Sequence, residues 1–140
     1  MTKTFRLKSL PKRIKLQPIE KKLTLRIKGD PISNGKLEAQ IQEEICTYLL
    51  SYNILFWVFN IHGKLIKTKR GFRRLYDENR GFSDILVCFK GYFISLEVKK
   101  CGGVASEDQL KTQTRVRNAG GIYEFVTSVR EVQFVFSRLK

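Results

Sequence analysis

Three charged side chains stand in two apolar, strand-like segments near the middle of the chain. Asp84 begins the first segment, and Glu97 and Lys99 lie at the end of the second. Because strand side chains alternate between the faces of a sheet, Glu97 and Lys99 share one face. If Lys90-Gly91 forms the turn of a hairpin, counting outward from it sets Asp84 opposite Glu97.

Two carboxylates in this arrangement suggest a divalent metal ion. Opposed strand residues have Cβ atoms roughly 5 Å apart, where like charges destabilise the pairing. One carboxylate must then bind a proton, unless a cation lies between them. Mg2+, or Mn2+, favours oxygen ligands and keeps several waters, which suits an open site of few carboxylates, and Lys99 could reach a phosphate oxygen there. The alternative is a structural ion network on a solvated face.

A helix is expected to supply a third oxygen ligand. Residues 37–52 carry apolar side chains at helical spacing, and three acids lie among them, Glu38, Glu43 and Glu44. At about 100° per residue, Glu38 lies within roughly 50° of the centre of the apolar stripe, Glu44 about 70° away and Glu43 on the opposite side. We therefore expect Glu38 to face the metal site.

The remaining elements predict an α/β fold in the order αβββαβα, with a mixed central sheet flanked by helices. A buried strand is expected at 54–60 with Trp57 in the core, then a long loop at 61–80, the hairpin, a helix from Ser106 to Gly120, a strand at 122–126 and a terminal helix after Ser128. Ser106 as N-cap would make Gln109 part of a capping box, and the competing role is support of the site.

The charge balance indicates an anionic partner. Lys and Arg total 27 against 13 Asp and Glu, a net charge of +14, so nucleic acid is expected rather than a membrane. We divide the chain into a basic arm at 1–35, in which Leu23, Leu25 and Ile27 alternate as in an edge strand, and a domain at 36–140. Three scattered cysteines and no secretory segment point to the cytoplasm or the nucleoid.

Basic residues with interleaved aromatics mark the expected contacts to the DNA backbone. The predicted contact residues are Lys64, Lys67, Lys69, Arg70, Arg73, Arg74, Lys100, Lys111 and Arg115.

Several short segments, in matching order over residues 37–132, resemble one nuclease family. They are Leu37-Glu38-Ala39-Gln40-Ile41-Gln42, Gly81-Phe82-Ser83-Asp84, Glu97-Val98-Lys99, Ser106-Glu107-Asp108-Gln109 and Ala119-Gly120-Gly121. Together they resemble the PD-(D/E)XK nuclease superfamily and, within it, the virus-type replication-repair (VRR-NUC) nucleases. Ser83 departs from the pattern, because the family name expects proline there.

The resemblance implies metal-dependent hydrolysis of DNA phosphodiesters. It makes Asp84, Glu97 and the Val98 carbonyl metal ligands, with Glu38 completing or supporting the site. It makes Lys99 the residue that positions the attacking water, with Gln109 beside it. It also implies a homodimer that acts on structured or branched DNA, such as junctions or flaps. Sequence-specific cutting, cleavage of RNA, and binding without catalysis remain alternatives.

Overall fold

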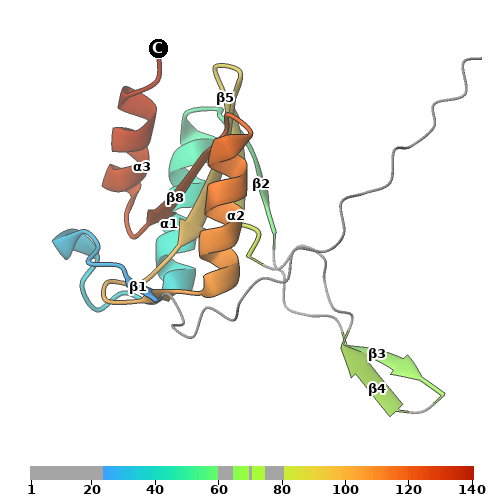
Figure 1. The fold of residues 1–140 in the computed structure, drawn as a ribbon. Coiled ribbons are helices and arrows are strands. Elements are labelled where there is room, and N and C mark those ends of the chain that lie inside the picture. The colour runs from blue at the N-terminus through green and yellow to red at the C-terminus, as the bar shows by residue number, and fades with distance from the viewer. Residues whose placement is uncertain (1–23, 60–64, 70, 75–80) are drawn as a thin grey trace, which may run out of the picture.

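The computed structural model describes residues 24–59, 65–69, 71–74 and 81–140. Within them lie helices α1 (Glu38–Ser51), α2 (Glu107–Asn118) and α3 (Val129–Ser137), a short 3-10 helix (Pro31–Ser33), and strands β1 (Leu25–Arg26), β2 (Leu55–Val58), β3 (Leu65–Thr68), β4 (Gly71–Arg74), β5 (Ile85–Phe89), β6 (Tyr92–Val98), β7 (Val104–Ala105) and β8 (Ile122–Val126) (Figure 1). None of the helices in these residues is long and apolar enough to cross a bilayer.

The central sheet is mixed, as the sequence predicts. Its order is β2-β5-β6-β8; β2 pairs with β5 and β5 with β6 in antiparallel fashion, whereas β6 and β8 are parallel. Helices α1 and α3 contact each other and pack on one face of the sheet, whereas α2 lies on the other (Figure 1). The expected order of helices and strands along the domain is confirmed, with additional short strands inserted.

The predicted hairpin register is confirmed. Phe89 pairs with Tyr92, and the pairing continues to Ile85 opposite Leu96. The turn residues Lys90 and Gly91 both have positive φ angles, 50° and 80°, as a two-residue turn with the twist of its strands requires. One further step along both strands brings Asp84 opposite Glu97.

The main core fills the space between the sheet and α1 and α3. Ile41, Ile45 and Leu49 recur at helical spacing on α1 and are fully buried. They meet strand residues such as Val87 and Ile94, which alternate toward the same face. Burying each such side chain contributes about 1.5–3 kcal/mol, so this face anchors the helix whose first turn carries Glu38.

The strand predicted at 54–60 is present as β2, over residues 55–58, but the prediction that it is buried is wrong. Within β2, Leu55 is 58% exposed and Trp57 is 48% exposed, so Trp57 is not a core residue. The reason is tertiary: β2 is the edge strand of the sheet, and α2 packs on β8 at the opposite edge. An unbroken apolar run does not reveal whether a helix will cover it.

The prediction of a loop at 61–80 is also wrong in part. Strands β3 and β4 pair with each other as a separate hairpin, with Leu65 opposite Arg74 and Thr68 opposite Gly71. The many basic residues in this stretch weaken the alternation of apolar and polar side chains by which two short strands would be recognised in the sequence. Residues 60–64, 70 and 75–80 lie outside the described part of the chain.

The described end of the predicted arm is bonded to the rest of the fold. Strand β1 pairs with β7, as the alternation of its residues favours. The buried carboxylate of Asp30 accepts hydrogen bonds from Arg130 Nε (2.8 Å) and Ser128 Oγ (2.8 Å), and its backbone N–H donates to Thr127 Oγ1 (2.7 Å). Arg130 chiefly, with the bonds from Ser128 and the Ile32 N–H, lowers the pKa of Asp30 to about 2 against the opposing effect of burial. Asp30 and the 3-10 helix that follows it are thus held beside the start of α3, while residues 25–26 are held by β7.

Candidate active site

Asp84 and Glu97 lie at the end of the β5–β6 ladder, where backbone pairing stops. Phe59 N–H donates to the Asp84 carbonyl (2.8 Å), which holds this residue against the β2 side. Asp84 Oδ2 accepts a hydrogen bond from the backbone N–H of Val98 (2.8 Å). The carboxylate thereby takes the place that a carbonyl of β5 would occupy if the ladder continued. This bond fixes Asp84 at the strand end, next to Glu97.

The residue before Asp84 has a local structural role. Ser83 is fully buried, and its hydroxyl donates to the Ile85 carbonyl (3.3 Å). A hydroxyl that bonds to the backbone two residues away stabilises a compact turn. Ser83 therefore supports the entry to β5 at the position where the resemblance expects proline.

Both carboxylate oxygens of Glu97 have partners. Its side chain is buried, with 4% of the residue exposed. Gln109 Nε2 donates to Oε1, and Lys99 Nζ lies 3.4 Å from the same oxygen. Tyr123 Oη lies 3.4 Å from Oε2. Side chains from α2, from β8 and from Lys99, the residue that follows β6, therefore converge on this one carboxylate of β6.

The electrostatics of Glu97 are those of a carboxylate that needs a cation. Burial, and after it the neighbouring Asp84, raise the pKa of Glu97, whereas Lys99 and the Tyr123 hydroxyl lower it, and the net result is a pKa of about 7. Lys99 is the nearest cation, but its attraction does not offset the cost of desolvation. At neutral pH the carboxyl group is therefore divided between its protonated and ionised forms.

Gln109 serves the capping box and the site together. Its Oε1 accepts the Ser106 N–H (2.9 Å), while Ser106 Oγ accepts the Gln109 N–H (3.2 Å). Its Nε2 donates to Glu97. The two roles were expected to compete, and that expectation is wrong, because the carbonyl oxygen accepts one bond while the amino group of the same amide donates another. The cap of α2 thus orients a residue of the site.

Tyr123 is the residue that sequence reasoning missed. It is fully buried in β8 opposite Ser95, and its hydroxyl lies 3.0 Å from the Gly81 carbonyl as well as near Glu97. Gly81 has φ of +79°, and a Cβ there would overlap the carbonyl of Asp108 on α2. A buried tyrosine hydroxyl requires a hydrogen-bond partner. Only the parallel pairing of β8 with β6 shows that the partners here are Glu97 and the Gly81 carbonyl.

Glu38 contacts the chain segment that carries Lys99, on the side that its helical phase favours. Its Oε1 accepts the Lys100 N–H (3.3 Å), beside Lys99, whereas Glu44 pairs with Lys36 (2.7 Å). However, no three His, Cys, Asp or Glu side chains of the described ranges gather closely enough to hold a metal ion. The structure therefore brings Asp84 and Glu97 together without Glu38, whose role as a direct ligand stays a prediction.

The predicted DNA-contact residues fall in three groups. Lys100 and Arg115 are exposed, and Lys111 is exposed in an ion pair with Glu107 (2.7 Å). Lys67, Arg73 and Arg74 belong to the β3–β4 hairpin, and Lys69 is exposed at its turn. Lys64 and Arg70 lie outside the described residues.

The donor set at the strand end fits a hard divalent cation. Asp84 and Glu97 offer oxygen ligands, and Mg2+ in proteins is commonly held by one or two carboxylates together with waters and substrate phosphates. The ionised form of Glu97 is disfavoured by burial and by Asp84, and a cation between the two would relieve both effects. The Val98 carbonyl follows Glu97 directly and is the expected further oxygen.

We expect the stability of the metal-free protein to fall as pH rises from about 4.5 to 7. The folded protein holds a proton on Glu97 in this range that the unfolded chain has released, so deprotonation favours unfolding, by an amount on the order of 2–3 kcal/mol above pH 7. Urea unfolding in chelator at pH 5 and pH 8 measures the effect. The difference between the protein and Glu97→Gln isolates this group, and Mg2+ at pH 8 should restore stability. Equal pH slopes for the two proteins would contradict the assignment.

Comparison with known proteins found no matching family model, no matching curated protein and no matching solved structure. A functional assignment therefore depends on the geometry and electrostatics of the site.

Proposed function

We propose that this protein is a divalent-metal-dependent DNA endonuclease with a PD-(D/E)XK core of the VRR-NUC type. The observation that carries the proposal is the environment of Glu97. This buried carboxyl group has a pKa near 7, lies beside Asp84, and has the Lys99 ammonium 3.4 Å away. Two neighbouring carboxylates that a bound cation would stabilise, next to the ammonium group of Lys99, suit hydrolysis of a phosphodiester.

Each residue has a distinct role in this proposal. Asp84 and Glu97, with the Val98 carbonyl, would hold Mg2+ or Mn2+, which when bound would polarise the phosphate and make water a better nucleophile at neutral pH. Lys99 would position the attacking water and offset the charge that builds on the phosphate oxygens. Its side chain is only 12% exposed, so its charge acts in a medium of low dielectric, where it is less screened than in water.

The surrounding residues would keep the site in place. Gln109 and Tyr123 contact opposite oxygens of Glu97, which restrains the rotation of its carboxylate. Glu38, bonded to the Lys100 N–H, would orient the segment that carries Lys99. Restraint of this kind matters because catalytic groups lose much of their effect when displaced by about 1 Å.

The substrate we propose is DNA with a junction, flap or other branch, cut by a homodimer. The net charge of +14 supports a polyanionic partner. Exposed Lys100 and Arg115 lie on the segments that follow β6 and form α2, both of which contribute residues to the site. Contacts of this kind bind the phosphate backbone without reading its sequence.

We expect cleavage of at least one branched substrate with Mg2+ and no cleavage in chelator. Duplex, nicked, flap and four-way DNA, and the same shapes in RNA, should be assayed side by side, with binding measured in parallel. Binding to every substrate with no cleavage of any, in either Mg2+ or Mn2+, would favour a non-catalytic binding protein instead. Cleavage confined to RNA would retain the chemistry but change the substrate.

A further inference from the structure

An exposed apolar strip lies on the sheet face that carries α2, beyond the area that this helix covers. The strip consists of the exposed Leu55, Trp57, Phe59 and Phe93, with the half-buried Phe82 at one end. Backbone register places Leu55 opposite Cys88 and Cys88 opposite Phe93, so their side chains share a face. Trp57 lies opposite Leu86 and shares that face. Phe93 is 45% exposed, comparable with the 48% of Trp57.

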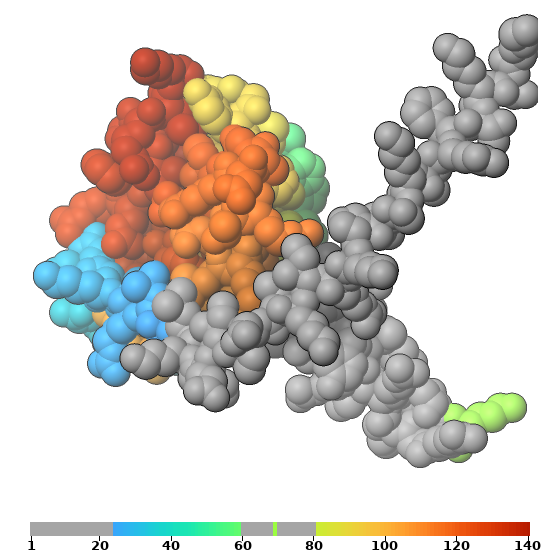
Figure 2. Space-filling model, in the orientation of Figure 1, coloured from blue at the N-terminus to red at the C-terminus, as the bar shows by residue number. Residues whose placement is uncertain are grey.

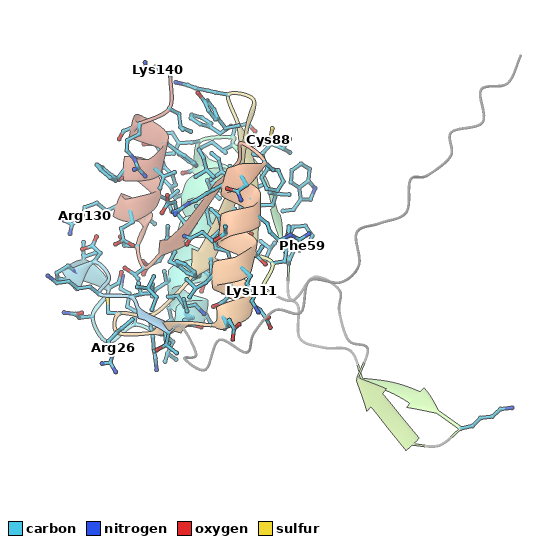
Figure 3. All side chains as sticks on the ribbon, in the orientation of Figure 1. Arg26, Phe59, Cys88, Lys111, Arg130 and Lys140 are labelled. Carbon is cyan, nitrogen blue, oxygen red and sulfur yellow. The ribbon has the colours of Figure 1, made fainter. Side chains whose placement is uncertain are left out.

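The strip leads directly to the candidate site. Phe59 N–H donates to the Asp84 carbonyl, and the rings of Phe59 and Phe82 meet edge to face with centroids 5.0 Å apart. Phe82 is two residues before Asp84 in the chain. Phe59 and Cys88 lie along the flank beside α2 (Figure 3), and atoms of β2 and of the β5–β6 hairpin reach the surface next to that helix (Figure 2). A ligand on the strip would therefore end at the carboxylates.

The border of the strip is positively charged. Gly81, which precedes β5, lies against Asp108 at the start of α2, so the side of α2 that carries Asp108 is beside the start of β5. Arg115 is seven residues after Asp108 and so lies within about 20° of it around the helix, with Lys111 about 60° away. Arg115 forms no ion pair within the described ranges, whereas Arg117, on the β8 side of α2, pairs with Glu124. The strip itself contains no charged side chain.

Exposed aromatic rings next to cations, and next to the proposed site of phosphodiester cleavage, suit unpaired nucleotides as the ligand better than they suit another protein. Exposed aromatic side chains stack bases of any sequence, while neighbouring cations follow the backbone. A second copy docked through this face would set its own Lys111 and Arg115 against the same two cations, which opposes a dimer through the strip at low salt.

We propose that the strip binds the unpaired bases of a DNA strand and leads that strand to Asp84 and Glu97. This inference rests on the proposed nuclease function and deepens it: the preferred substrate has a single-stranded segment next to the bond that is cut. Trp57 is the main stacking platform, and Phe59 with Phe82 forms the end of the track nearest the site.

Trp57 is the only tryptophan in the chain, so its fluorescence reports on the strip alone. In chelator, which prevents cleavage, oligothymidylate should quench this fluorescence saturably, and a blunt duplex of equal length should quench it much less. By anisotropy of labelled DNA, Trp57→Ala should weaken single-strand binding about tenfold and duplex binding less than twofold. Trp57→Phe should keep most of the affinity.

Phe134→Ala is the matched control, because Phe134 is an exposed aromatic on α3, which packs against the other face of the sheet. It should leave single-strand binding unchanged. Equal single-strand affinity for Trp57→Ala and the unaltered protein would overturn the inference, most clearly if Trp57→Ala also converted a dimer to a monomer by light scattering. Quenching without any cleavage would support the strip as a binding site and contradict the proposed nuclease activity. Cleavage without quenching would support the nuclease activity and contradict the strip as a binding site.

Discussion

Asp84→Asn is expected to lower the single-turnover rate of DNA cleavage by about a thousandfold or more, while DNA binding stays the same or becomes tighter. Asn keeps an oxygen that can accept the Val98 N–H, so the strand end should retain its geometry. What is lost is the negative charge that would hold the cation with Glu97. Loss of a metal ligand removes several kcal/mol of transition-state stabilisation, and each 1.36 kcal/mol is a factor of ten in rate.

The measurement is single-turnover cleavage of a branched substrate at saturating enzyme, with binding followed by anisotropy in chelator. Glu43→Gln is the matched control, because Glu43 is an exposed acid on α1, away from the stripe that faces the core. It should cut normally. Undiminished turnover by Asp84→Asn would refute the metal assignment, and an equal loss in both variants would point to general charge effects.

Lys99→Met is expected to lower the same rate by roughly a hundredfold to a thousandfold. Met keeps an unbranched apolar side chain, so the largely buried stem of Lys99 should still be packed, and only the ammonium group is removed. Removing one preorganised group that stabilises developing charge has an effect of this size in other enzymes. The loss should appear in the cleavage step and not in the affinity for DNA.

Lys100→Ala provides an adjacent control. Lys100 is exposed and offers its backbone N–H to Glu38, a bond that the substitution leaves in place. It should weaken DNA binding at moderate salt and leave the rate at saturating DNA unchanged. If Lys99→Met instead weakens binding and cuts at the normal rate once saturated, Lys99 is a backbone contact and not part of the chemistry.

The parts of the fold that follow from local periodicity could be predicted. The spacing of Ile41, Ile45 and Leu49 identifies the buried face of α1, and the Lys90-Gly91 turn determines the β5–β6 register. Both depend on short-range geometry, which a sequence records directly. The opposition of Asp84 and Glu97 follows from that register by counting.

Other features depend on which elements come together. Ile85 and Val87 in the apolar run of β5 are fully buried, whereas Leu55 and Trp57 in a similar run of β2 are exposed, because the sheet order makes β2 an edge and α2 packs toward β8. Nothing in the run itself distinguishes these cases. The exposed strip with Trp57 was therefore not foreseen.

By itself the sequence determined the local geometry of this protein: its helices and main strands, the hairpin, and the two facing acids with Lys99 nearby. Only the tertiary structure decided how deeply Glu97 is buried, that Gln109 and Tyr123 contact its two oxygens, and that Glu38 bonds to the Lys100 backbone instead of joining the acids. The physical reason is that desolvation and long-range hydrogen bonds depend on parallel pairing and helix packing between residues distant in the chain. Those contacts leave no periodic signal, yet they set the pKa of the residue on which the proposed chemistry depends.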